Sequence, residues 1–209
     1  MQNIIYEEYD NYWIYDNIIF IKSSFDNKIS NNNFPLLLDN NNEIIDNKLT
    51  ELVFSDYETI ISSISIDNHN KNTYIEYKEF NSKTDYNESK FNNYIDKIPS
   101  NIIHLTFGSK FNQLVDNLSN KLIYLTFGNY FNQSLNNLPN SLTHLDVGYS
   151  FNQPLNNLPN SITHLILGYY FEQSIEDLPN SITDLYIMYY CYGGYTGKLS
   201  NKIKVHYID

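Results

Sequence analysis

The sequence repeats itself every twenty residues. The block "FNQSLNNLPNSLTHLDVGYS" at 131–150 is followed by "FNQPLNNLPNSITHLILGYY" at 151–170 and by "FEQSIEDLPNSITDLYIMYY" at 171–190. The period begins at Phe91 and never slips, so that apolar residues recur at fixed positions in each block. Self-similarity at a fixed short period is the mark of a solenoid, because one repeat cannot bury its apolar face and must stack on its neighbours.

A short alternation of apolar and polar residues in each block predicts a β-strand. In "SLTHLDVG", Leu145 and Val147 alternate with His144 and Asp146, a period of two that turns one face inward. Stacked coils pair such strands in parallel, and a coil this short leaves little length for a helix on the outer side. We therefore expect a mainly β, leucine-rich-repeat-like solenoid of 20-residue coils, with a parallel β-sheet on one face and divergent strands and caps at both ends.

Glycine and amide residues mark the corners of the expected coil. A glycine follows the strand at 108, 128, 148 and 168, where a Cβ would be costly if φ is positive. Amide side chains satisfy buried turns because they supply a donor and an acceptor together. We expect two amide columns to bond to the backbone of adjacent coils: Gln113, Gln133, Gln153 and Gln173, and Asn120, Asn140, Asn160 and Asn180.

Blocks such as "FNQPLNNLPNSITHLILG" resemble the FNIP repeat, a relative of the leucine-rich repeat found in proteins of amoebae and of the giant viruses that infect them. The resemblance covers residues 91–188, and the last block departs from it with Glu172 in place of Asn and Met188 in place of Gly. Members of this family often carry an N-terminal F-box, which docks into ubiquitin-ligase complexes. Residues 1–45 lack the helical periodicity that such a module needs, and their composition favours strand and turn.

The patterns divide the chain into four segments. Residues 1–46 are a divergent N-terminal segment or cap, in which "YWIYDNIIFIK" is either a hairpin turning at Asp16-Asn17 or one broken strand. Residues 47–90 are irregular strands that lead into the solenoid. Leu49, Leu52 and Phe54 form an outlying coil in this segment, and strands are expected at 60–66 and 73–80. Residues 91–190 are the FNIP repeat solenoid, and residues 191–209 are a C-terminal cap.

Charge and cysteine content exclude several classes of partner. The formal net charge is -11 and Arg is absent, which argues against nucleic acid and against an anionic membrane surface. No apolar run is long enough to span a bilayer. Cys191 is the one cysteine and has no disulfide partner within the chain. These features favour an intracellular, cytoplasmic location, which is the host cytoplasm if the chain is viral.

The sequence contains no arrangement typical of catalysis. We recognise no spacing that joins a nucleophile, a base and an orienting group, and no glycine-rich phosphate loop, so we expect no enzyme activity, no catalytic residue and no cofactor. The outward column His104, Tyr124, His144, His164, Asp184 places imidazoles about 5 Å apart on adjacent strands. A zinc site at His144 and His164 with Asp146 or Asp184 is conceivable, but a solvated ladder is favoured and we expect no metal.

Tyrosines that follow the strands are the main candidates for recognition, because Tyr brings a large contact area at small conformational cost. The candidate partner-binding residues are Tyr130, Tyr149, Tyr169, Tyr170, Tyr189 and Tyr190, together with His144, Asp146, His164 and Tyr186 on the strand face. We expect a non-enzymatic protein–protein interaction module whose acidity favours a basic protein partner. The alternatives are a substrate-recruiting adaptor of a ubiquitin-ligase complex, as in the F-box-bearing relatives, and self-association through exposed solenoid ends.

Overall fold

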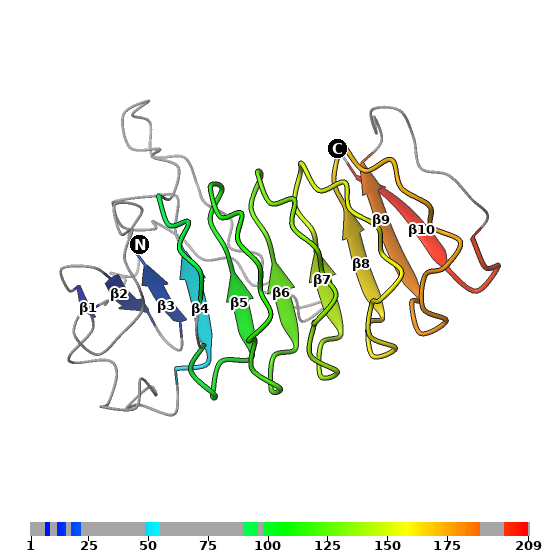
Figure 1. Cartoon of the computed structure of the whole chain (residues 1–209). Coiled ribbons are helices and arrows are strands. Elements are labelled where there is room, and N and C mark those ends of the chain that lie inside the picture. Colours follow the sequence, from blue (N-terminus) through cyan, green and yellow to red (C-terminus); the bar gives the residue numbers. More distant parts are fainter. Residues whose placement is uncertain are drawn as a thin grey trace, which may run out of the picture.

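A computed structural model describes residues 7–8, 12–15, 18–21, 49–54, 90–95, 98–188 and 199–208. Their strands form one ten-stranded sheet in which spatial order follows chain order from β1 to β10 (Figure 1). The bounds are β1 (Glu7–Glu8), β2 (Tyr12–Tyr15), β3 (Ile18–Ile21), β4 (Glu51–Phe54), β5 (His104–Thr106), β6 (Tyr124–Thr126), β7 (His144–Asp146), β8 (His164–Leu167), β9 (Asp184–Met188) and β10 (Lys204–Ile208). Every regular element in the described ranges is a strand.

The sheet changes from antiparallel to parallel near its N-terminal edge. β1 pairs antiparallel with β2, and β2 pairs antiparallel with β3, with Tyr15 opposite Ile18. The hairpin reading of "YWIYDNIIFIK" is therefore confirmed. From β3 to β10 each strand is parallel to the next, and Leu49, Leu52 and Phe54 are buried around β4, which confirms the outlying coil. The expected strands at 60–66 and 73–80 lie outside the described residues.

The pairing register equals the sequence period. Leu125 pairs with Leu145, Leu145 with Leu165, and Leu165 with Leu185, so residues twenty apart are direct neighbours. The same shift continues into β10, where Val205 pairs with Leu185. The parallel-sheet solenoid is confirmed, and its strand register extends beyond the last block that the sequence pattern identifies.

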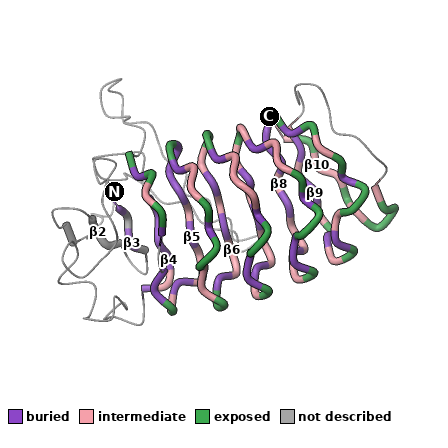
Figure 2. Tube along the Cα trace, in the orientation of Figure 1, coloured by how far each residue is buried: buried purple, intermediate pink, exposed green. Residues whose placement is uncertain are grey.

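Phenylalanine forms a continuous stack inside the coils. Phe111, Phe131, Phe151 and Phe171 are at most 1% exposed, and consecutive rings lie about parallel with centroids 6.0 to 6.3 Å apart. Phe131 also stacks on Phe127 of the preceding coil at 3.6 Å. Buried residues run along the strands and exposed residues gather at the outer turns (Figure 2). Burial of this stack, rather than local strand propensity, orders strands that are only three residues long.

The glycine column is required mainly by the closeness of the coils. A Cβ at Gly128 would lie 2.3 Å from the carbonyl oxygen of Gly108, and one at Gly168 would lie 2.0 Å from that of Gly148. Among the described glycines only Gly148 has a positive φ, of 77°. The expectation based on φ therefore holds at one position. Where Met188 replaces glycine, β9 runs on to five residues instead of ending before that position.

The amide ladder uses a different asparagine from the one expected. Asn132 Oδ1 accepts hydrogen bonds from the Asn152 backbone N–H at 2.9 Å and from Gln153 Nε2 at 3.1 Å, and the same arrangement joins the other coils from Asn92 to Gln173. Gln thus bonds to an asparagine side chain rather than to backbone. The expectation for Asn120, Asn140, Asn160 and Asn180 was wrong, because all four are exposed at the outer corner. The turn there is closed by Pro139 and Pro159 carbonyls, which accept from the N–H three residues on.

Candidate partner-binding surface

A tyrosine rim, made of Tyr130, Tyr149, Tyr169 and Tyr170, lies in the turns that follow β6, β7 and β8. Tyr149 and Tyr169 stack with centroids 5.1 Å apart and an interplanar angle of 5°, and Tyr170 meets both edge-on. Tyr130, Tyr149 and Tyr170 are 50%, 36% and 44% exposed, while Tyr169 is half-buried. Desolvation and the neighbouring phenols of Tyr170 and Tyr169 raise the pKa of Tyr149.

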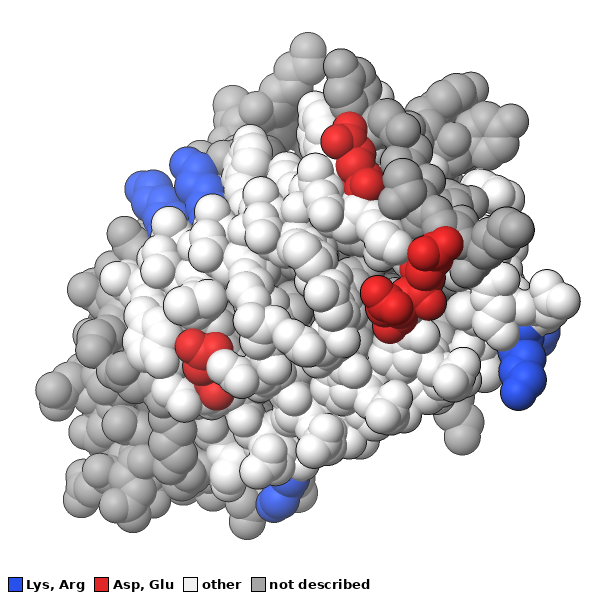
Figure 3. All heavy atoms as spheres, turned by 45° about the vertical axis from the view of Figure 1, so that its right-hand side comes forward, with Lys and Arg blue, Asp and Glu red and all other residues white. Residues whose placement is uncertain are grey.

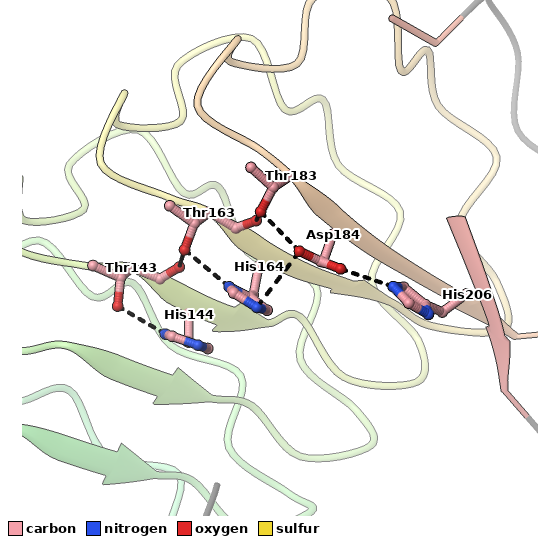
Figure 4. Close-up of polar contacts among 7 residues, drawn as sticks. All are labelled: Thr143, His144, Thr163, His164, Thr183, Asp184 and His206. Carbon is pink, nitrogen blue, oxygen red and sulfur yellow. Dashed lines mark hydrogen bonds and ion pairs between the residues drawn. The ribbon is translucent and has the colours of Figure 1, made fainter. Parts of the chain in front are cut away.

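A row of ring side chains crosses the outward side of the sheet. His144 stacks on His164 with centroids 4.2 Å apart and on Tyr124 at the same distance, and His104 tilts against Tyr124. Threonine hydroxyls fix the two imidazoles, since Thr143 Oγ1 lies 2.8 Å from His144 Nδ1 and Thr163 Oγ1 lies 2.9 Å from His164 Nδ1 (Figure 4). The twenty-residue register makes this row, because each ring stands beside the equivalent position of the next coil.

Carboxylates stand at both ends of this row. Glu51 lies 3.5 Å from His104 Nδ1 at the N-terminal end. At the other end Asp184 Oδ1 lies 2.8 Å from His206 Nε2, and Asp184 Oδ2 lies 3.7 Å from His164 Nε2 and accepts a hydrogen bond from Thr183. Figure 4 places Asp184 between the two histidines. The hydrogen bond from His206 is the main cause of a lowered pKa of Asp184.

His206 and Glu51 were missed by sequence reasoning. A signal for His206 existed, because it lies twenty residues after Tyr186, on which it stacks at 4.5 Å. Extending the period beyond residue 190 would have found it. Glu51 pairs with His104 in the register, but the insertion between β4 and β5 hides this relation in the sequence.

The imidazole geometry does not favour the conceivable zinc site. The rings of His144 and His164 are parallel within 14°, so their nitrogen atoms lie side by side instead of converging on one ion as tetrahedral ligands do. His164 and His206 approach Asp184 from opposite sides. Within the described ranges no three His, Cys, Asp or Glu side chains form a group suited to a metal ion.

The two polar side chains of β7 have displaced pKa values. Burial, together with the charges of His164 and His104, lowers the pKa of His144 to about 4, so this ring is neutral at pH 7. Burial raises the pKa of Asp146 to about 6, opposed by a hydrogen bond in which the Gly148 N–H donates to Oδ1 at 3.0 Å. Asp146 is half-buried, with Thr126 and Ile166 as its neighbours on β6 and β8.

Replacing Asp146 with Asn is expected to stabilise the protein at neutral pH. The folded-state pKa of Asp146 lies above its unfolded value, so its contribution to stability is present below about pH 4 and is lost as the pH rises through about 6. We expect Asp146→Asn to raise the free energy of unfolding by about 1 to 2 kcal/mol at pH 7.5, with little change at pH 4. Urea unfolding at both pH values measures this difference, and an equal effect at the two values would contradict it.

Few charged side chains appear among the described residues on the face shown in Figure 3. Acidic side chains, some of them adjacent, lie on a mainly uncharged surface, with basic side chains near the margins of the view. Exposed asparagines form side-chain hydrogen bonds between successive coils, as between Asn157 Nδ2 and Asn136 Oδ1 at 2.9 Å. These amides join successive coils and are therefore satisfied within the solenoid.

The structure brings the candidate residues together as two groups. Tyr149, Tyr169 and Tyr170 meet in the rim, and His144 and His164 meet in the row. Asp146 and Tyr186 lie in the second outward column, with Ile166 between them. Tyr189 and Tyr190, like Cys191, lie outside the described residues.

Comparison with known proteins identifies the repeat. The FNIP repeat family model matches residues 114–150, 131–170 and 151–190. The solved structure of CroV588, described as a circular leucine-rich-repeat protein, is 28% identical with a TM-score of 0.58 and covers 90% of this chain. This chain spans 26% of CroV588, and no curated protein matches it. Among the described residues no helix is long and apolar enough to cross a membrane.

Proposed function

We propose that the chain is a non-enzymatic protein–protein interaction module, because residues 114–190 match the FNIP repeat family model and the fold is a leucine-rich-repeat-like solenoid. The tyrosine rim is the observation that carries the proposal. Three of its four rings are exposed by 36% or more, although they stand on a rigidly stacked core. Exposed aromatic side chains held in place by their neighbours are typical anchors of protein interfaces, because little conformational entropy is lost when a partner covers them.

The strand face adds a polar surface next to this rim. Its rings are stacked on one another and its threonines are bonded to imidazoles, so the surface is ordered before a partner arrives. We propose that the partner contacts the rim and the strand face together. An intracellular, cytoplasmic setting is part of the proposal, since the lone Cys191 has no disulfide partner within the chain.

The ubiquitin-ligase adaptor stays a prediction without specific support. The described residues of segment 1–46 are strands of the sheet, whereas a docking F-box is helical. These described residues therefore supply no feature that favours the adaptor over a general interaction module.

The rim is tested by removing two of its rings. We expect the double variant Tyr149→Ala, Tyr170→Ala to retain less than about a tenth of the partner that the unchanged chain captures from lysate, since interface anchors contribute about 2 kcal/mol or more. Quantitative mass spectrometry of the captured proteins provides the measurement. Because both rings are exposed, the variant should keep a cooperative thermal transition.

Leu114→Ala is the matched control. Leu114 is a large apolar side chain that is 42% exposed and holds a different place in the twenty-residue period from the rim tyrosines. Its loss should leave capture unchanged. Equal capture by the double variant and by the unchanged chain would reject the rim as the binding surface.

A further inference from the structure

Asp146 is the carboxylate on the strand face that has no cationic neighbour in the described structure. Glu51 lies against His104, and Asp184 lies against His206. Among the residues that the structure describes, none forms an ion pair with Asp146, whose one recorded bond is from the Gly148 N–H to Oδ1. The titratable groups on the outward sides of β6, β7 and β8 beside it are Tyr124, His144 and His164.

Asp146 stands among the outward side chains of three neighbouring strands. Thr126 and Ile166 occupy the paired positions on the two flanking strands, and His144 stands two residues earlier on the same strand. All of these side chains point to the open side of the sheet. A ligand on that side of the sheet would meet the carboxylate with the apolar Ile166 beside it.

We propose that Asp146 receives a basic side chain, Lys or Arg, of the protein partner. The inference rests on the proposed function, and it adds the chemistry of the partner and the point of contact. A Lys or Arg side chain fits both the carboxylate and the apolar residue beside it, because its charged end pairs with Asp146 and its aliphatic stem covers Ile166. The net charge of -11 favours the approach of such a partner.

The electrostatic state of β7 supports this occupant. Burial raises the pKa of Asp146 to about 6, so the ionised carboxylate present at neutral pH is less favourably solvated here than in water. His144 does not compete for the carboxylate as a cation, because its own pKa is lowered to about 4. A partner's ammonium or guanidinium would favour the ionised carboxylate, and its binding would therefore lower the pKa of Asp146.

The test uses N-acetyl-lysine methylamide as the probe of a lysine side chain. With about 100 mM probe we expect the titration midpoint of the Asp146 carboxyl carbon, followed by NMR, to fall by about half a pH unit, as linkage requires for a weak site. The neutral analogue N-acetyl-norleucine methylamide should leave the midpoint unchanged. A shift no larger than that produced by tetramethylammonium chloride at the same concentration would overturn the proposal.

Two variants locate the effect. In Asp146→Asn the probe should no longer move the amide signals of Thr126 and Ile166, whereas in Asp116→Asn, which removes an exposed acid at an outer turn, those shifts should persist. If the probe still moved the amide signals of Thr126 and Ile166 in Asp146→Asn, the proposal would also be overturned. If the probe experiment fails while capture of a partner still depends on the tyrosine rim, the proposed interaction function stands and only the basic contact at Asp146 is rejected.

Discussion

Leu165→Asn is expected to lower the free energy of unfolding by about 3 to 4 kcal/mol, because it removes a buried Leu and leaves an amide without partners in the core. Leu165 is 0% exposed and stands in the leucine ladder between Leu145 and Leu185. The stack has no alternative packing for the gap, since each neighbour is fixed by its own coil. Denaturant unfolding followed by circular dichroism measures the loss.

Ile166→Asn is the matched control on the same strand. Ile166 follows Leu165 directly but points outward and is half-buried, so its replacement should cost less than about 1 kcal/mol. The two substitutions make nearly the same chemical change at adjacent residues. Similar losses in both variants would contradict the assignment of inward and outward positions.

Gly128→Ala is expected to cost about 3 kcal/mol although it adds a single methyl group. The added Cβ would lie 2.3 Å from the Gly108 carbonyl oxygen and 2.7 Å from the Ser109 Cα, both of which are backbone atoms. A side chain could rotate away from such a contact, but the backbone of a paired coil can only separate, which places the effect at the upper end of overpacking penalties of about 1 to 3 kcal/mol. Thermal unfolding monitored by calorimetry provides the measurement.

Asn129→Ala controls for a change in the same turn. Asn129 is exposed, and the interaction recorded for it is a backbone one, in which its carbonyl accepts from the Ser150 N–H. We expect a change below about 0.5 kcal/mol. A mild effect of Gly128→Ala, comparable with that of Asn129→Ala, would mean that the coils are less closely stacked than described here.

Much of the fold could be predicted because the period carries it. Once residues twenty apart are known to be neighbours, Leu145 and Leu165 must pair and His144 must stand beside His164. The roles of the asparagines in the turns could not be predicted in the same way. Asn120 and Asn132 recur equally regularly, and only the coil geometry decides that the second accepts the inter-coil bonds while the first is exposed.

The sequence predicts which residues form the candidate surface, but not all of the contacts between them. Periodicity placed Tyr149 beside Tyr169, but the edge-on contact of Tyr170 depends on turn geometry. The displaced pKa of Asp146 arises from how far neighbouring side chains enclose it, which a sequence column does not express. The pairing of Glu51 with His104 depends on a long insertion between paired strands.

Distances between spin labels along one column test the stacked solenoid most directly. Cysteines placed pairwise at Asn120, Asn140, Asn160 and Asn180, in a Cys191→Ser background, carry the labels at exposed corners of successive coils. Electron paramagnetic resonance should give separations that grow by about 5 Å for each twenty residues, so that labels at 120 and 180 lie about 15 Å apart. Separations that do not increase in equal steps, or labels sixty residues apart at several times that distance, would contradict the stacking of coils in register.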